Sequence, residues 1–511
     1  MPERLQGFKW LIRSSTTIFI GSAAGQAIGI SATILLSRSL GLEAFGRFSI
    51  LIGLISLSAG VVTNAFSRSQ ARFTASYLGQ EDGDSLMGTL YFGLLASFLC
   101  SLALALFMAF NSSWISLSYL NDASMEQLLR VAVFVVPCIS LTGCILQTLR
   151  GLGYVIDRIL IESILRPILR GSSYLLLFSS LSLPLVIYLE IGILYLLLAV
   201  ALVLLFFRSR PFHGARPRFD FREYTRFTLP LLPASAASQL THNLPLLSLG
   251  WFNMVEQAAL YAIGLRIAAF GRTLVMSLNS NFAPMISNYQ GGGRMDELAV
   301  LFRKVSRILL IVTSAWVAAC IVYASDILRL FGLEFEGAYG ALVILAALTL
   351  PIGVLGPVTN MITMTGHSKV TMFSSVINLG LIAVLVLVLV PQYGAIGAAA
   401  SVVLSAFFFQ AYQAYWLYRL HRMVGVSVNG ILFAISMVAI SASVVQMRAL
   451  FLANYLQYEQ LIFVSIIFLL GAYLLLFIFT SRSERQSILD FTLKIFSKRT
   501  LHNKVGATLN K

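Results

Sequence analysis

Three charged residues share a four-residue spacing inside an apolar stretch of this sequence. Glu162, Arg166 and Arg170 lie within residues 158–177, which read RILIESILRPILRGSSYLLL. In a helix, residues four apart face the same side, so the three side chains form one stripe. A charge at the centre of a bilayer costs at least about 2.5 kcal/mol, and such a charge is by default a candidate functional residue.

The composition is that of a membrane protein. Of the 511 residues, 58% are hydrophobic and 11% are charged, and the mean hydropathy is +0.85. Soluble domains carry about 25% charged residues, so this class is excluded. The net charge of +15 could indicate nucleic acid, but its distribution argues for membrane topology and against a nucleic-acid partner. Four cysteines in apolar runs and five scattered histidines predict neither disulfides nor a metal site.

A membrane span needs about 20 apolar residues, and the sequence contains fourteen such segments. We therefore predict an all-α polytopic membrane protein of about 14 transmembrane helices. The segments are 15–37, 47–66, 86–110, 128–149, 159–181, 184–207, 227–250, 258–286, 303–323, 338–364, 370–390, 395–418, 428–448 and 459–480.

The basic residues predict the orientation. With a cytoplasmic N-terminus, and with basic residues at the very ends of spans counted with the adjoining loops, the cytoplasmic segments hold 26 of the 36 Lys and Arg residues, the external loops four and the spans six. This asymmetry follows the positive-inside rule and places both termini in the cytoplasm, which requires an even number of spans. The six arginines of the 208–226 loop are expected to lie against anionic lipid headgroups.

Short sequence landmarks recur at offsets of 209, 215 and 207 residues: Leu-Gly at 40 and 249, GLGYV at 151 with GHSKV at 366, and a turn proline at 184 and 391. Two six-span halves in the same orientation predict a pseudo-two-fold axis along the membrane normal, with the site at their interface. The predicted regions are the N-terminus 1–14, an N-lobe 15–207, the arginine-rich loop 208–226, a C-lobe 227–418, accessory helices 428–480 and a basic tail 481–511.

Motifs along residues 15–420 resemble the polysaccharide transporter family of the multidrug/oligosaccharidyl-lipid/polysaccharide flippase superfamily. They are SRSLGLEAFGRFSIL (37–51), LRGLGY (149–154), FAPMIS (282–287), DILRLFGLEFEGAYGALVIL (326–345), MTGHSK (364–369) and PQYGAIGAAASVVLS (391–405). Each motif is weak alone, whereas their order and spacing are specific. The sequence departs from many relatives near the end of the seventh span, where His242, Asn243 and Pro245 stand in place of an acidic residue.

The resemblance implies a flippase of the bacterial inner membrane that serves O-antigen, lipopolysaccharide or exopolysaccharide assembly by alternating access. Its substrate would be a polyprenyl-diphosphate-linked oligosaccharide, and a polysaccharide polymerase would be a candidate partner. Arginine stays charged and can bind phosphate oxygens in a bidentate way. Arg170 is the first candidate for the diphosphate because it lies halfway along its span, with Arg166 one turn nearer the cytoplasm. The alternative for Arg170 is a structural ion pair with Glu162 or Glu190. Arg272 and Arg266 are the candidates in the eighth span.

The other candidate site residues are polar. Gln26, Asn64, Asn279, Asn360 and Asn378 are possible sugar contacts or helix–helix hydrogen bonds. His242, Glu190 and Glu162 are the candidates for proton coupling, with a structural ion pair as the alternative for Glu162. YQGGGRMDEL (289–298) lacks the Lys-Ser/Thr of a phosphate-binding loop, so neither ATP nor another cofactor is expected.

Three other functions stay open. A cation-coupled drug exporter of the same superfamily would share the fold, although span arginines outnumber span acids by six to two. A membrane enzyme of lipid-linked sugar assembly would need catalytic groups outside the membrane, but the longest external loop, 111–127, contains no Lys, Arg or His. A purely structural membrane scaffold is the last alternative.

Overall fold

The computed structural model describes residues 8–119, 122–212, 214–425, 428–451 and 457–479. These residues form helices and their connections, and no strand occurs among them. The predicted all-α class is therefore confirmed. The predicted basic tail and the first half of the predicted N-terminus lie outside the described residues.

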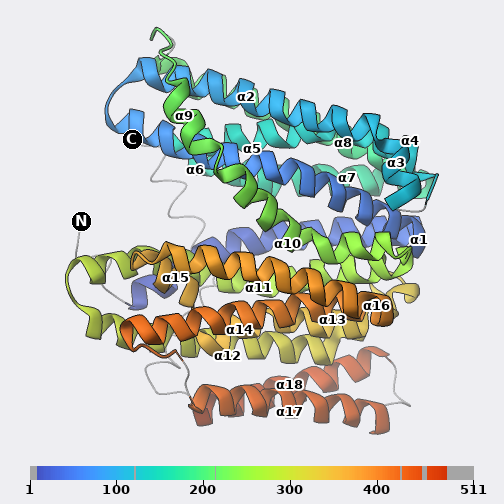
Figure 1. The fold of residues 1–511 in the computed structure, drawn as a ribbon. Coiled ribbons are helices and arrows are strands. Elements are labelled where there is room, and N and C mark those ends of the chain that lie inside the picture. The colour runs from blue at the N-terminus through green and yellow to red at the C-terminus, as the bar shows by residue number, and fades with distance from the viewer. Residues whose placement is uncertain (1–7, 120–121, 213, 426–427, 452–456, 480–511) are drawn as a thin grey trace, which may run out of the picture.

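The helices follow one another with short connections (Figure 1). The α-helices are α1 (Phe8–Gly79), α2 (Gly83–Phe110), α3 (Ser112–Trp114), α4 (Met125–Ala132), α5 (Val135–Gly151), α6 (Val155–Ile159), α7 (Arg166–Leu176), α8 (Leu183–Ser209), α9 (Phe221–Thr228), α10 (Leu231–Trp251), α11 (Val255–Gly291), α12 (Met295–Arg329), α13 (Tyr339–Ala346), α14 (Leu350–Leu355), α15 (Val358–Met364), α16 (Ser368–His421), α17 (Val428–Phe451) and α18 (Gln457–Phe479). The π-helices η2 (Ile115–Tyr119) and η3 (Leu160–Leu165) and the 3₁₀-helices η4 (Phe178–Ser180), η5 (Arg210–Phe212), η6 (Leu333–Ala338) and η7 (Ala347–Thr349) lie between them.

Nine helical segments of the described chain are long and apolar enough to cross a membrane. Two of them, 22–79 and 369–421, each contain two of the predicted spans. The protein is therefore a multi-pass membrane protein, while the count of fourteen stays a prediction. The predicted spans 159–181, 227–250 and 459–480 are not among the nine. Polar residues interrupt the apolar runs of the first two, and the third is represented by a shorter apolar helix, 462–475.

The two longest helices change direction at glycines. Gly41 has φ 74° and Gly394 has φ 53°, a left-handed conformation that costs glycine little. At the second turn, the amide N–H of Ala395 donates to Gln257 Oε1 at 3.2 Å. A β-carbon on Gly394 would lie 2.9 Å from that same oxygen. Each long helix therefore provides two passes of the bundle (Figure 1).

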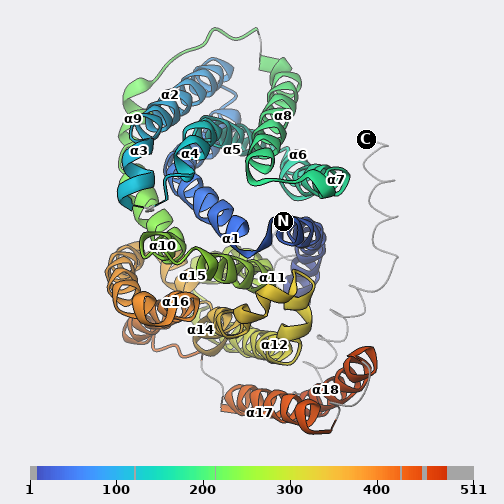
Figure 2. The ribbon, with the colours of Figure 1, turned by 90° about the vertical axis from the view of Figure 1, so that its right-hand side faces the viewer.

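The helices gather in two groups, seen end-on in Figure 2. We call α1–α8 the N-lobe and α10–α16 the C-lobe. α1 packs against α2, α5 and α7 of the N-lobe and also against α10 and α11 of the C-lobe. One apolar cluster extends through both groups, and a second, from Val275 to Met423, belongs to the C-lobe alone. α1 and α11 are therefore the principal elements of the interface.

The lobes are joined by hydrogen bonds at the end of the bundle where α1 turns, which we call the Gly41 end. There the Ser37 hydroxyl donates to the Phe331 carbonyl at 3.0 Å, and Arg38 Nε donates to the Leu330 carbonyl at 2.7 Å. In return, Glu334 Oε2 accepts from the Leu42 amide at 3.1 Å. Each lobe thereby caps a helix end of the other, satisfying backbone groups that a helix leaves free.

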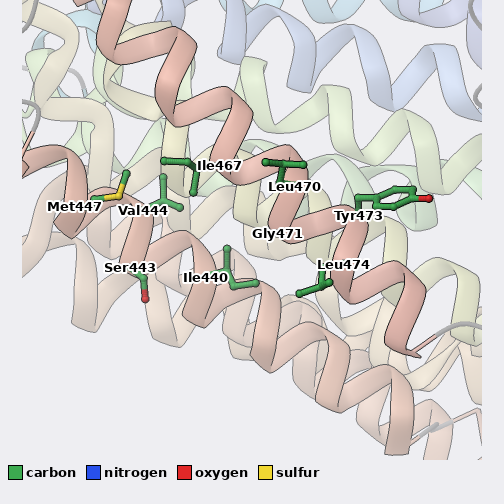
Figure 3. A pocket seen from close by; sticks show the side chains of 9 residues that line it. All are labelled: Ile440, Ser443, Val444, Met447, Ile467, Leu470, Gly471, Tyr473 and Leu474. Carbon is green, nitrogen blue, oxygen red and sulfur yellow. The ribbon is translucent and has the colours of Figure 1, made fainter.

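α17 and α18 form a separate pair that packs on α12 (Figure 2). Arg448 binds Asp326 with two hydrogen bonds of 2.6 and 2.8 Å, and the Tyr323 hydroxyl donates to Ser465 at 3.0 Å. An apolar groove of about 540 Å³ runs between the two helices, lined by residues such as Val444 and Leu470 (Figure 3). None of the residues that line it is charged.

One boundary differs from the sequence-based expectation. The arginine-rich loop predicted over 208–226 contains the start of α9, which begins at Phe221. The Asp220 carboxylate caps this helix by accepting from the Glu223 amide at 3.1 Å, and Tyr224 is buried among Phe66, Phe73 and Phe92. A capping aspartate followed by a buried aromatic side chain is enough to form two turns of helix.

Candidate functional site: an arginine cluster in the helices

The stripe of charges predicted in the fifth span lies on an irregular helix. Residues 160–165 form the π-helix η3, so that the Arg166 amide donates to the carbonyl of Ile161, five residues back. Pro167 has no N–H to donate in this turn, and the Ser163 carbonyl faces α1. A β-carbon on Gly25 of α1 would lie 2.2 Å from that carbonyl oxygen. Only glycine lets α1 approach this closely.

Arg170 is paired within the N-lobe. Its Nε donates to Glu190 Oε2 of α8 at 2.9 Å, and its Nη2 bonds the same oxygen. The hydroxyl of Tyr174 donates to the other oxygen, Oε1. The side chains of Arg170 and Glu190 are only 18% and 4% exposed. Glu190 is thus held from both sides in a buried ion pair.

Two further arginines lie near this pair. Arg166 interacts electrostatically with Arg170, Glu190 and Arg266, and Arg266 of α11 interacts with Arg170 and Glu190. Nε of Arg166 is buried without a hydrogen-bond partner. Within the described part of the chain, neither Arg166 nor Arg266 forms an ion pair. We call Arg166, Arg170 and Arg266 the arginine cluster; it contains residues of both lobes.

Three polar side chains on the C-lobe side of this region are exposed. They are Arg266 and Arg272 of α11 and His242 of α10. Arg272 is within electrostatic range of His242.

The net charge of the cluster is positive. Three guanidinium groups and the one carboxylate of Glu190 leave a net charge of +2. Glu162 is also in electrostatic range of Arg166, but its carboxylate accepts from Arg158 Nε at 2.9 Å and that pair is neutral. Unpaired buried charges are costly, and a bound anion would remove this cost. The arrangement can bind an anion through planar guanidinium groups.

The other predicted site residues are dispersed. The amide of Gln26 bonds Thr273 Oγ1 and connects α1 with α11. Asn360 donates to the Asn279 backbone carbonyl at 3.3 Å, and the side-chain oxygens of Asn279 and Asn378 are buried without partners. Asn64 lies half-buried on α1. The structure therefore brings Arg166, Arg170, Arg266 and Glu190 together, but not the candidate sugar contacts.

Two residues of this region were not anticipated from the sequence. Tyr174 continues the four-residue spacing of positions 162, 166 and 170, so the same stripe could have identified it. Thr273 follows Arg272 directly and gives no such signal. The predicted alternative of a Glu162–Arg166 pair is wrong, because Glu162 bonds Arg158 instead.

The comparisons with known proteins agree with this architecture. The MatE family matches residues 230–389, which lie within the C-lobe. No curated protein matches the sequence. Among solved structures, the lipid II flippase MurJ in an inward closed conformation is similar with a TM-score of 0.69 at 13% identity, covering 90% of this chain and 98% of MurJ.

Two other solved structures show the same likeness. A multidrug resistance MATE family transporter of the MOP superfamily, in an inward-facing conformation, has a TM-score of 0.64 at 16% identity and covers 80% of this chain and 98% of that protein. A MOP superfamily transporter from Pyrococcus furiosus has a TM-score of 0.57 at 17% identity and covers 85% and 98%. The chain therefore has the fold of MATE and MOP superfamily transporters.

Proposed function

We propose that this protein is a flippase that moves a polyprenyl-diphosphate-linked oligosaccharide across the bacterial inner membrane for surface polysaccharide assembly. The observation that carries the proposal is the arginine cluster. Arg166 and Arg266 approach Arg170 from opposite lobes with a single carboxylate among them. A diphosphate carries its charge on a compact group of oxygens, and guanidinium groups bind such oxygens best.

The charge and the position of the cluster support this substrate class. A diphosphate esterified at both ends carries about two negative charges at neutral pH, which equals the cluster's net charge of +2. The exposed side chains of Arg272 and His242 provide further polar groups of the C-lobe for a headgroup. Alternating access requires the two lobes to bind one ligand, and Arg266 lies on the opposite lobe from Arg166.

The rival proposal is a cation-coupled drug exporter. The fold gives it support, because one of the similar structures is a multidrug resistance transporter. A cationic drug needs carboxylates that are free to bind it, and the one carboxylate of the cluster is already occupied by Arg170 and Tyr174. The site therefore favours an anionic substrate.

The test is transport in proteoliposomes that contain the full-length protein. A fluorescent prenyl-diphosphate-linked oligosaccharide is placed in one leaflet, and its appearance in the other is followed by quenching. We expect flipping by the natural sequence and its loss in the double variant R166Q/R266Q. A lipophilic cation should neither be transported nor compete. Transport of the cation in place of the anion would establish the rival function.

A further inference from the structure

We infer that Glu190 sets the charge preference of the arginine cluster, acting as a built-in anion that selects substrates with about two negative charges. The inference rests on the proposed function, because it concerns the anion that the cluster binds. It assigns to Glu190 a role in specificity instead of proton transfer.

The carboxylate of Glu190 is fixed in place. Both of its oxygens are engaged, Oε2 by Arg170 and Oε1 by the Tyr174 hydroxyl, and only 4% of the side chain is exposed. All three side chains belong to the N-lobe, so relative movement of the lobes leaves the group intact. A fixed internal anion contributes the same negative charge to the site throughout transport.

This negative charge acts on the arginines that are free to bind a ligand. Glu190 interacts electrostatically with Arg166 as well as with Arg266 on the opposite lobe. Without Glu190 the cluster would carry a charge of +3, and a third negative charge on the ligand would gain an additional attraction. Two unit charges about 4 Å apart interact by about 1 kcal/mol in water and by more in a protein interior. One unit of charge near the ligand therefore changes its affinity by about tenfold or more. The number of negative charges that the cluster prefers on its ligand therefore depends on the side chain of Glu190.

A purely structural role for Glu190 makes a different prediction. If the carboxylate only joins α7 to α8, its replacement changes stability and lowers the affinity for all anions alike. The two roles are separated by the ratio of affinities for anions of different charge, because this ratio does not depend on how much of the protein is folded.

The experiment measures binding of three lipid probes to the full-length protein in nanodiscs. The probes are a dialkyl phosphate, a prenyl diphosphate glucose diester and a prenyl diphosphate, which carry about one, two and three negative charges at neutral pH. For E190Q we expect the affinity for prenyl diphosphate relative to the diester to rise about tenfold or more. Y174F removes a hydrogen bond to the same carboxylate without changing the charge, and its affinity ratio should equal that of the natural sequence.

The double variant R170Q/E190Q keeps the net charge of +2 and removes both members of the buried ion pair together, so that neither is left without its partner. It replaces E190Q if that variant does not fold. We expect it to show the affinity ratio of the natural sequence. A ratio in E190Q equal to that of the natural sequence, or an altered ratio in the double variant, would overturn the inference. The proposed function itself fails if R266Q binds all three probes as tightly as the natural sequence, or if the natural sequence binds none of them.

Discussion

The arginines at the Gly41 end and the arginines of the cluster differ in whether they have hydrogen-bond acceptors. At the Gly41 end, Arg38 donates to backbone carbonyls, Arg329 pairs with Glu336 at 2.5 Å and Arg47 pairs with Asp122 at 2.8 Å. In the cluster only Arg170 has a carboxylate partner. Arginines with acceptors hold the structure together, whereas arginines without them are available to a ligand. The acceptors of each arginine therefore indicate whether its role is structural or ligand binding.

The largest effect is expected at Arg266. R266Q should weaken binding of a prenyl diphosphate glucose diester about a hundredfold, because a charge-assisted hydrogen bond contributes about 1.5–3 kcal/mol. The thermal unfolding midpoint should stay the same or rise, since an unpaired charge has been removed. R329Q at the Gly41 end is the matched control and should leave the affinity unchanged. Equal losses of affinity in both variants would abolish the distinction between the two regions.

The next effect concerns the paired arginine of α17. D326A leaves Arg448 partly buried without its partner and should lower the free energy of unfolding by about 2 kcal/mol. The double variant D326L/R448M removes both charges and should recover most of the loss. Unfolding is followed by the accessibility of the natural cysteines to a thiol reagent on heating. A stable single variant would show that the pair is not structural.

A smaller effect is expected where α1 meets the fifth span. G25A places a β-carbon 2.2 Å from the Ser163 carbonyl oxygen and should cost about 1–2 kcal/mol through displacement of α1. It should also weaken diester binding, because Arg166 lies directly after this turn. Nothing lies within 4 Å of a β-carbon on Gly29, so G29A is the control and should be neutral. If G25A is equally neutral, the close approach does not position the cluster.

The smallest effect is expected for the pair Arg158–Glu162. Both side chains are more than one third exposed, so E162Q should change the free energy of unfolding by less than about 0.5 kcal/mol. Affinity for the diester should also be unchanged, because the variant leaves the cluster's own four charges intact. A strong loss of binding in E162Q would show that Glu162 belongs to the ligand site and is not merely the ion-pair partner of Arg158.

Much of the fold followed from the sequence because the bilayer imposes simple rules. Apolar length and the distribution of Lys and Arg predicted a polytopic helical protein, and helices occupy the predicted segments within the described residues. The spacing of Glu162, Arg166 and Arg170 also identified the helix that carries most of the site. These rules use only residues that are close together in the sequence, so a single sequence is enough to apply them.

Contacts between helices could not be predicted in this way. The sequence offered Arg170 as the first candidate for the diphosphate, with a pair to Glu162 or Glu190 as the alternative. The structure shows the pair with Glu190, twenty residues away on another helix. The π-helix before Arg166 shifts the register of the stripe, and ideal helical spacing does not include such an insertion. Whether a C-lobe residue lies near Arg166 depends on tertiary packing, and only the structure shows that Arg266 does.

The reciprocal caps at the Gly41 end have an energetic consequence for how often the lobes separate there. α1 forms four hydrogen bonds to the C-lobe at this end, from Ser37, twice from Arg38 and from the Leu42 amide. At about 1 kcal/mol each, their loss would make the separated state about a thousandfold rarer than the joined one. A ligand that opens this end must therefore favour the separated state by a comparable ratio of affinities.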